Sequence, residues 1–256
     1  MSSPLLQVAD VRLAFGGLQA LDGPSFTVGD GEIVGLIGPN GAGKTSLFNC
    51  VSGLYHPQSG SIRVDGTEVI GLPRHRVTSL GVGRTFQNLG LFASQTVLEN
   101  VLAGAYHVTR GGYWATALAL PRVARAEAVT RDDAQTLLDT LGLGDVAHRI
   151  AGTLPFGTLK RVELARALLS SPRLLLVDEP ANGLIQSEVA ELGATLRGLA
   201  AQRGTAILLV EHHMGLVMST CDRVVVLDFG RRIAEGAPSD VARDPAVVAA
   251  YLGSAA

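Results

Sequence analysis

The chain has no long run of charge of one sign and almost no net charge. Its 256 residues carry 21 basic and 23 acidic side chains, for a formal net charge of −2 at pH 7. The basic clusters at residues 74–76 and 231–232 are short and are read as solvated surface. A nucleic-acid partner therefore has no electrostatic support, because that binding depends on many Lys and Arg contacts to phosphates.

Cysteines and long apolar runs are also scarce. The two cysteines, Cys50 and Cys221, lie far apart and have no metal-ligand spacing, so we expect reduced thiols in a cytosolic protein. No apolar run approaches the ~20 residues that a membrane-spanning helix needs. The first ten residues lack the basic and apolar pattern of a signal peptide. We therefore expect a soluble protein whose positive mean hydropathy reflects large buried strands.

What the chain does contain is an alternation of short apolar runs with helical patterns. The runs lie at residues 33–37 (IVGLI), 174–177 (LLLV), 206–210 (AILLV) and 224–227 (VVVL). Their continuous apolar character predicts strands of a parallel sheet covered by helices on both faces, and so an α/β fold. Three further short segments in the first 70 residues, VRLAF, SFTV and SIRVDGTEV, are separated by Gly-rich turns and predict an antiparallel β layer.

The middle of the chain, residues 89–154, has a helical pattern. The segments VLENVLAGAY and RAEAVTRDDAQTLLDTLGL carry apolar residues at three-to-four spacing. We expect one domain over residues 1–256, in which 1–88 and 155–256 form a catalytic core and 89–154 form an inserted helical subdomain. The sequence shows no internal repeat.

Residues 38–45 fit the phosphate-binding pattern G-x-x-x-x-G-K-[ST], between a strand-like and a helix-like segment. Glycines let backbone N–H groups wrap an anion, and the following helix directs its N-terminus to the same place. Lys44 would reach the β- and γ-phosphates, and the Thr45 hydroxyl would hold Mg²⁺. The predicted nucleotide-binding residues of this loop are Gly38, Pro39, Asn40, Gly41, Ala42, Gly43, Lys44, Thr45 and Ser46.

The apolar run at residues 174–177 ends in two adjacent carboxylates, Asp178 and Glu179. Ligands of open α/β sheets bind at the carboxyl ends of the strands, where this pair is expected. Asp178 would hold Mg²⁺ directly or through water, and Glu179 would act as the general base for an attacking water. Together with the phosphate-binding loop, the pair predicts hydrolysis of a nucleotide such as ATP.

At this point the chain resembles, along essentially its whole length, the nucleotide-binding subunits of ABC transporters. The resemblance implies a P-loop NTPase core with a parallel sheet, an antiparallel β layer and an inserted helical subdomain. It places Phe15 where an aromatic ring stacks on adenine. Gln87, in RTFQN, falls at the Q-loop, whose glutamine approaches Mg²⁺ and couples to the membrane subunit. His212 falls at the switch histidine, which contacts the γ-phosphate. By chemistry alone His213 is an equal candidate, and His212 is preferred because it directly follows Glu211.

The family's signature, usually LSGGQ, acts on ATP bound by the other subunit of a dimer. Its position here is occupied by LPFGT, which comprises Leu154, Pro155, Phe156, Gly157 and Thr158. Loss of one hydrogen bond to a charged group costs about 1.5–3 kcal/mol when nothing compensates. Ile185 also stands where the family carries Asp or Asn. The two segments that would act on a partner's nucleotide therefore differ from the family pattern. This difference predicts a heterodimer with asymmetric sites; a homodimer is the alternative.

The subgroup most similar to this chain is an ATPase subunit of branched-chain amino-acid importers. The similarity rests on FGGLQAL, NCVSGLYHPQSG, GRTFQNLGLFASQTVLENVL and the closing AYLG, and on residues 104–127. Importers of urea or amides and the lipopolysaccharide-export ATPase share several of these stretches. An apolar patch around Tyr113 and Trp114 would pack on a membrane subunit or, equally well, in the helical subdomain.

The resemblance implies three partners: a second ATPase subunit, transmembrane permease subunits and, indirectly, a solute-binding protein. It places the chain at the cytoplasmic face of the bacterial inner membrane. A nucleotide-gated module with weak hydrolysis is a competing function, favoured by LPFGT and Ile185 and opposed by Glu179 and His212. An ABC ATPase acting on DNA or ribosomes would need a basic surface and a second ATPase unit. The transported solute is not encoded in this chain, since the binding protein and the permease select it.

Overall fold

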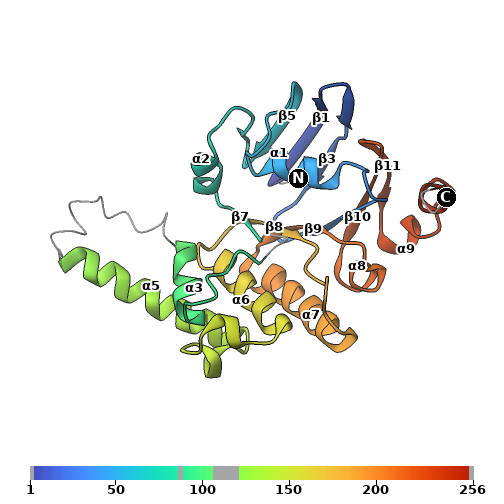
Figure 1. The fold of residues 1–256 in the computed structure, drawn as a ribbon. Helices are drawn as coiled ribbons and strands as arrows, with labels where there is room; N and C mark the ends of the chain where they lie inside the picture. The colour runs from blue at the N-terminus through green and yellow to red at the C-terminus, as the bar shows by residue number, and fades with distance from the viewer. Residues whose placement is uncertain (1–2, 86–88, 106–120, 254–256) are drawn as a thin grey trace. The chain divides into compact units, whose positions relative to one another are not determined.

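The computed structural model describes residues 3–85, 89–105 and 121–253 (Figure 1). The chain divides into two compact units. The larger comprises residues 1–84 and 173–256, and the smaller comprises residues 85–172. Within the described parts of the chain, no helix has both the length and the apolar character that crossing a membrane requires.

The larger unit is built on a six-stranded sheet, in which every neighbouring pair is parallel except β10 and β11. The order is β11-β10-β4-β9-β8-β7. The strands are β4 (Ile33–Ile37), β7 (Val82–Arg84), β8 (Leu174–Asp178), β9 (Ala206–Val210), β10 (Arg223–Asp228) and β11 (Arg231–Gly236). Every residue of β4, β8 and β9 is buried, as their continuous apolar runs predict. The predicted α/β class is confirmed.

The predicted antiparallel layer is also present. It consists of β1 (Leu6–Phe15), β2 (Leu18–Asp22), β3 (Phe26–Val28), β5 (Ser59–Val64) and β6 (Thr67–Glu68). One apolar core joins both sheets and includes Leu47 and Phe48 of helix α1 (Lys44–Val51). The unit's other helices are α2 (Arg74–Ser79), α7 (Gln186–Arg203), α8 (Met214–Thr220), α9 (Pro238–Val241) and α10 (Pro245–Gly253).

The smaller unit is helical where it is described. It contains α3 (Val97–Leu102), α5 (Pro121–Thr140), α6 (Phe156–Leu168) and the 3₁₀ segments η1 (Ala103–Ala105), η2 (Gly144–Val146) and η3 (Ala151–Thr153). The sequence prediction ended the helical subdomain at residue 154, whereas α6 belongs to this compact unit because it packs against α3, η1 and α5. The contact is close: a Cβ added to Gly104 would lie 2.0 Å from the Arg166 carbonyl oxygen.

Both cysteines are free thiols in the interior. Burial raises the pKa of Cys50 to about 12 and, as the largest cause, that of Cys221 to about 12. The thiols therefore stay protonated at neutral pH and are poor nucleophiles.

Candidate active site

Three loops meet at the carboxyl edge of the parallel sheet. The glycine-rich loop follows β4. Asp178 is the last residue of β8 and Glu179 comes next, while Glu211 and His212 follow β9. Because β9 pairs with both β4 and β8 in parallel register, the three loops leave the sheet on the same side. Sequence positions more than 130 residues apart are thereby brought to one site.

The glycine-rich loop adopts a conformation that needs its glycines. Gly38, Gly41 and Gly43 have φ angles of 149°, 81° and 98°, in the region that side chains disfavour. A Cβ on Gly38 would lie 2.1 Å from the Leu227 carbonyl oxygen, and one on Gly43 would lie 2.5 Å from the Ala20 carbonyl oxygen. The loop thus forms a backbone cradle at the start of α1, which is the arrangement that suits a phosphate group.

Lys44 begins α1 and is the charged centre of the cradle. Its Nζ donates hydrogen bonds to the carbonyl oxygens of Gly38 at 2.7 Å and Pro39 at 3.0 Å. Burial lowers the pKa of Lys44, while the charges of Glu179 and Asp178 act in the opposite direction. Thr45 is exposed and Ser46 half-buried in the same first turn, where backbone N–H groups have no partner within the helix. The residues therefore fit a polyanionic phosphate.

Asp178 is almost fully buried, with 3% of its side chain exposed. Its Oδ2 lies 3.4 Å from Nη2 of Arg84, at the end of β7. Arg84 also donates through Nη1 to Asn49 Oδ1 and Ser52 Oγ, each at 2.8 Å. Arg84 therefore ties the carboxylate to helix α1. The sequence analysis missed this residue, since no motif marks it.

Glu179 has a strained backbone and a half-buried side chain. Its φ of 46° lies in the left-handed region, which costs about 1–2 kcal/mol for a side-chain-bearing residue. Its N–H donates to the Val210 carbonyl oxygen at 2.9 Å, which holds the turn in place. Strain of this kind is typical of functional sites. His212 lies across from it, with Nδ1 4.0 Å from Glu179 Oε1.

Glu211 holds the loops after β8 and β9 together. Its carboxylate is fully buried and accepts hydrogen bonds from the backbone N–H groups of His212 at 2.8 Å, His213 at 3.0 Å and Ala181 at 3.0 Å. Sequence reasoning used Glu211 only to locate the histidine. Its position directly after the buried run AILLV was the available signal.

The geometry separates the two neighbouring histidines. His213 Nδ1 accepts the backbone N–H of Leu216 at 3.2 Å and so caps α8. His212 is 61% exposed, and its ring lies beside Glu179 and Glu211. His213 thus serves the helix, whereas His212 lies beside the two carboxylates, and its role as the switch histidine stays a prediction.

Phe15 lies at the end of β1, with 46% of the residue exposed. Its ring packs edge-on against Tyr55, with centroids 5.2 Å apart. The preceding residue, Ala14, exchanges two backbone hydrogen bonds with the Gln58 side-chain amide, at 2.9 and 3.0 Å. Phe15 is thus an exposed ring on a fixed backbone, as a stacking platform requires.

Gln87 lies outside the described residues, as do Tyr113 and Trp114. LPFGT belongs to the smaller unit, where Leu154 is buried while Pro155 and Phe156 are exposed at the start of α6.

The Phe156 ring lies under the Lys160 ammonium, 5.6 Å from Nζ to the ring centroid. Ile185 precedes α7 in the larger unit, and 66% of the residue is exposed. The apolar side chains of Phe156 and Ile185 are therefore not buried in the cores of their own units, and both are accessible to a partner chain.

The donor set near Lys44 fits Mg²⁺ better than a metal held by protein alone. Within the described residues no three His, Cys, Asp or Glu side chains gather as a metal cluster. Thr45 and Asp178 instead offer two oxygen donors beside the phosphate cradle. Mg²⁺ is usually held by one or two such side chains, with phosphate oxygens and waters completing its coordination.

Comparison with known proteins gives the family. The family model described as ABC transporter matches residues 21–182, and one described as branched-chain amino acid ATP-binding cassette transporter matches residues 231–256. Two high-affinity branched-chain amino acid transport ATP-binding proteins, BraF of Pseudomonas aeruginosa and LivG of Escherichia coli K12, are each 41% identical over 255 residues, with 100% of both chains covered.

Solved structures agree over nearly the whole chain. A nucleotide-free ATP-binding cassette from an ABC transporter has a TM-score of 0.84 and 29% identity, and covers 97% of this chain and 99% of its own. The ADP conformation of MJ1267, an ATP-binding cassette of an ABC transporter, has a TM-score of 0.84 and 28% identity, with 98% and 100% covered. The chain belongs to the ABC transporter family, as one of its ATP-binding cassettes.

Proposed function

We propose that this chain is the ATP-binding and ATP-hydrolysing subunit of an importer of branched-chain or related amino acids. The observation that carries the proposal is the meeting of Lys44, Asp178, Glu179 and His212 at one edge of the parallel sheet. The relatives BraF and LivG support the solute class by their names.

ATP binds through its phosphates to the loop of residues 38–45, and its adenine stacks on Phe15. The loop amides and the Lys44 ammonium compensate the negative charge of the phosphates. Thr45, Asp178 and Gln87 would hold Mg²⁺. When bound, this ion neutralises charge on the transferred phosphoryl group. Arg84 keeps the Asp178 carboxylate oriented through its contact with Oδ2.

Glu179 accepts a proton from the water that attacks the γ-phosphate. Its position depends on a strained turn held by Val210 and on the loop that Glu211 fixes through Ala181. His212 contacts the γ-phosphate from the neighbouring loop, and the short separation from Glu179 lets both side chains act on one group. The two roles differ: Glu179 moves a proton, and His212 orients.

A second ATPase subunit completes the site, and we propose that it is a different chain. The partner's signature closes ATP on this chain's Lys44, while LPFGT closes ATP on the partner. The exposed Pro155, Phe156 and Ile185 support a role in that contact. Fewer polar groups of this chain then contact the partner's nucleotide. Each lost hydrogen bond to a charged group costs about 1.5–3 kcal/mol of binding free energy. The partner's site is therefore slower.

Transport requires membrane-spanning permease subunits, to which the chain docks at the cytoplasmic face of the membrane. A solute-binding protein and the permease select the amino acid. This division of labour agrees with the sequence analysis, which predicts an ATP site in this chain and no site for the solute.

The test is uptake of labelled leucine into liposomes that contain the complete transporter, with this chain as wild type or Lys44→Ala. Uptake that needs MgATP, and that Lys44→Ala abolishes, is the expected result. Uptake of a urea or amide in place of leucine would overturn the solute class alone. If the complete transporter binds MgATP but releases no phosphate, the chain is a nucleotide-gated module and not an ATP-hydrolysing subunit.

A further inference from the structure

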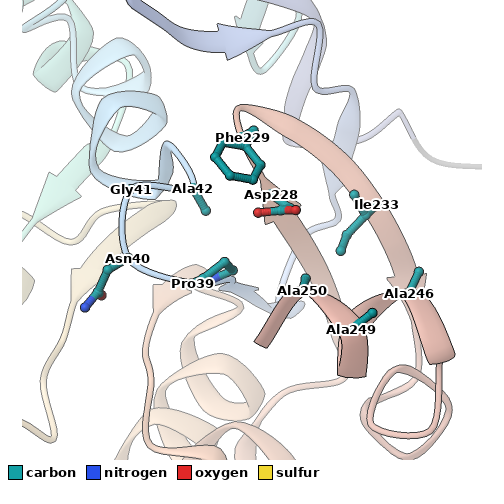
Figure 2. A pocket seen from close by; sticks show the side chains of 10 residues that line it. All are labelled: Pro39, Asn40, Gly41, Ala42, Asp228, Phe229, Ile233, Ala246, Ala249 and Ala250. Atoms are coloured by element: carbon teal, nitrogen blue, oxygen red, sulfur yellow. The ribbon is translucent and has the colours of Figure 1, made fainter. Parts of the chain in front are cut away.

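A cavity of about 420 Å³ lies between the phosphate-binding loop, the hairpin of β10 and β11, and helix α10 (Figure 2). This volume is within the range of small-molecule sites. Most of its walls are small or apolar, and they include Pro39, Ala42, Ile233, Ala246, Ala249 and Ala250. The three alanines recur at three-to-four spacing and so share one face of α10. Their short side chains leave the space beside the helix open.

The loop wall and the hairpin wall of this cavity are joined to each other. The Gly230 N–H donates to the Ala42 carbonyl oxygen at 3.0 Å. A Cβ on Gly38 would lie 2.1 Å from the Leu227 carbonyl oxygen, so the loop also lies directly against the end of β10. The cavity is therefore a fixed feature of the larger unit, and an occupant would contact loop residues 39–42.

Asp228, at the end of β10, is the one charged residue among the described residues that line the cavity. Figure 2 shows its carboxylate between Phe229, Ile233 and Ala250. In the described part of the chain, this carboxylate has no hydrogen-bond or ion-pair partner. A half-buried carboxylate thus faces apolar walls without a partner.

The arginines nearest to Asp228 in the sequence are used by other acidic residues. Arg231 Nε donates to Asp22 Oδ2 at 2.7 Å, and Arg232 pairs with Glu235. The Asp228 carboxylate therefore receives no cation from its own hairpin. A cation that enters the cavity would supply the missing charge partner.

Phe229 adds a second feature that favours a cation. Its ring lines the same cavity, and 82% of the residue is exposed. Its φ of 42° lies in the left-handed region, and strain of this kind is common at ligand-binding positions. The face of an aromatic ring attracts an ammonium group. The carboxylate and the ring together thus favour a cation, while Ile233 and the alanines favour an apolar body.

We propose that this cavity binds a small alkylammonium, a protonated primary amine that carries a compact apolar group. The ammonium pairs with Asp228 beside the Phe229 ring, and the alkyl group lies against Ile233 and the alanines of α10. The chemistry has two sources, a branched-chain amino acid and an amine without a carboxylate. The site is separate from solute selection for transport, and its existence does not depend on the proposed function.

The test is binding of isoamylamine to the purified full-length chain, measured by isothermal titration calorimetry at neutral pH. Isoamyl alcohol has the same apolar group without the charge and should bind at least about tenfold more weakly. Asp228→Asn keeps the shape but removes the charge, and it should weaken isoamylamine binding by about ten- to hundredfold. Ala249→Phe changes an exposed alanine into a ring that fills the cavity, and it should abolish binding.

Asp240→Asn is the matched control. Asp240 is an exposed carboxylate on α9 and is not among the described residues that line the cavity. Its variant should bind isoamylamine within about twofold of wild type, because solvent and salt screen exposed charges. Competition with L-leucine separates the two sources: displacement of isoamylamine assigns the amino acid, and no displacement assigns amines without a carboxylate.

A wild-type chain that binds no isoamylamine at millimolar concentration would overturn the inference. Equal affinity in Asp228→Asn, or an equal loss in Asp240→Asn, would also overturn it, since the Asp228 carboxylate would then not recognise the ligand. Unchanged binding by Ala249→Phe would place the ligand outside the cavity. None of these titrations contains ATP, so a failure of the proposed function, seen as a chain that binds no MgATP, is a separate result.

Discussion

The edge of the parallel sheet and the LPFGT segment differ in how far the chain completes them. At the sheet edge, Lys44, Asp178 and Glu211 are buried and hydrogen-bonded, and their partners come from several loops. In LPFGT, Pro155 and Phe156 are exposed at the start of α6. The residues proposed to bind ATP within this chain are therefore held by its own hydrogen bonds, whereas the segment proposed to act on a partner's nucleotide is partly exposed.

This difference explains where departures from the family pattern are tolerated. A change in a buried, hydrogen-bonded group leaves a partner unsatisfied within the same chain and costs about 1–3 kcal/mol or more. A change in an exposed segment costs little in folding, because water satisfies the groups around it. Pro155, Thr158 and Ile185 depart from the pattern where the structure leaves residues exposed or half-buried.

The largest effect is expected from removing the proposed general base, Glu179. Glu179→Gln keeps the shape but accepts no proton, so ATP hydrolysis at this chain's own site in the complete transporter should fall by about 10²–10⁴-fold. MgATP affinity should stay within a few-fold of wild type, because the phosphates are held by other residues. Phosphate release and nucleotide binding, measured side by side, check this. An unchanged rate of phosphate release by the complete transporter would remove Glu179 from its role.

The buried anchor should matter for stability. Glu211→Ala leaves three backbone N–H groups without their carboxylate acceptor, and the free energy of unfolding is expected to fall by about 2–4 kcal/mol. Urea denaturation followed by circular dichroism measures the change. Glu188→Ala is a suitable control, since Glu188 accepts only at the exposed start of α7. A similar small loss in both variants would contradict the anchoring role.

The two histidines offer a matched pair at one site. His212→Ala should lower the turnover number by about 100-fold, the scale for removal of one positioned donor. His213→Ala should leave turnover nearly unchanged and cost about 0.5–2 kcal/mol of stability through the lost cap of α8. Steady-state kinetics and thermal unfolding of both variants decide. The reverse pattern would assign the switch position to His213.

A smaller effect is expected at the adenine platform. Phe15→Leu removes the stacking ring but keeps apolar volume, and the affinity for MgATP should fall by about three- to tenfold, as for loss of an aromatic contact of 0.5–1.5 kcal/mol. GTP and ATP should weaken alike, because stacking reads no base edge. Fluorescent-nucleotide titration measures both. An unchanged affinity would place adenine elsewhere.

The smallest effect is expected from restoring the lent segment. Thr158→Gln adds the side chain that the family carries at this position, and turnover at the partner's site should rise by about two- to tenfold. Because Thr158 is half-buried in α6, folding should be little affected. Phosphate release is measured in a transporter in which this chain also carries Glu179→Gln, so that only the partner's site contributes to turnover. A fall in turnover would mean that LPFGT is adapted to its partner as it stands.

The sequence predicted those features that depend on one local pattern. The continuous apolar runs gave strands β4, β8, β9 and β10, and the glycine spacing gave a loop whose φ angles and close contacts need glycine. Features that depend on pairing between distant segments were not predictable in this way. Arg84 meets Asp178 only because β7 pairs with β8, and Glu211 meets Ala181 only because β9 pairs with β8.

Two further points needed the structure for different reasons. Helix α6 was expected with the catalytic core, yet it packs on α3, and periodicity alone does not say which neighbour a helix covers. His212 and His213 are chemically equivalent in sequence. In the structure the Leu216 N–H donates to His213, whereas His212 lies beside Glu179. The tertiary neighbours, which no local pattern encodes, decide both cases.

The most direct test of the unequal sites is phosphate release by the complete transporter in two forms. One form carries Glu179→Gln in this chain, and the other carries the same change at the matching glutamate of the second ATPase subunit. The account predicts that Glu179→Gln removes most of the turnover, while the change in the partner leaves most of it. Equal loss in the two forms would contradict the claim that this chain keeps the faster site.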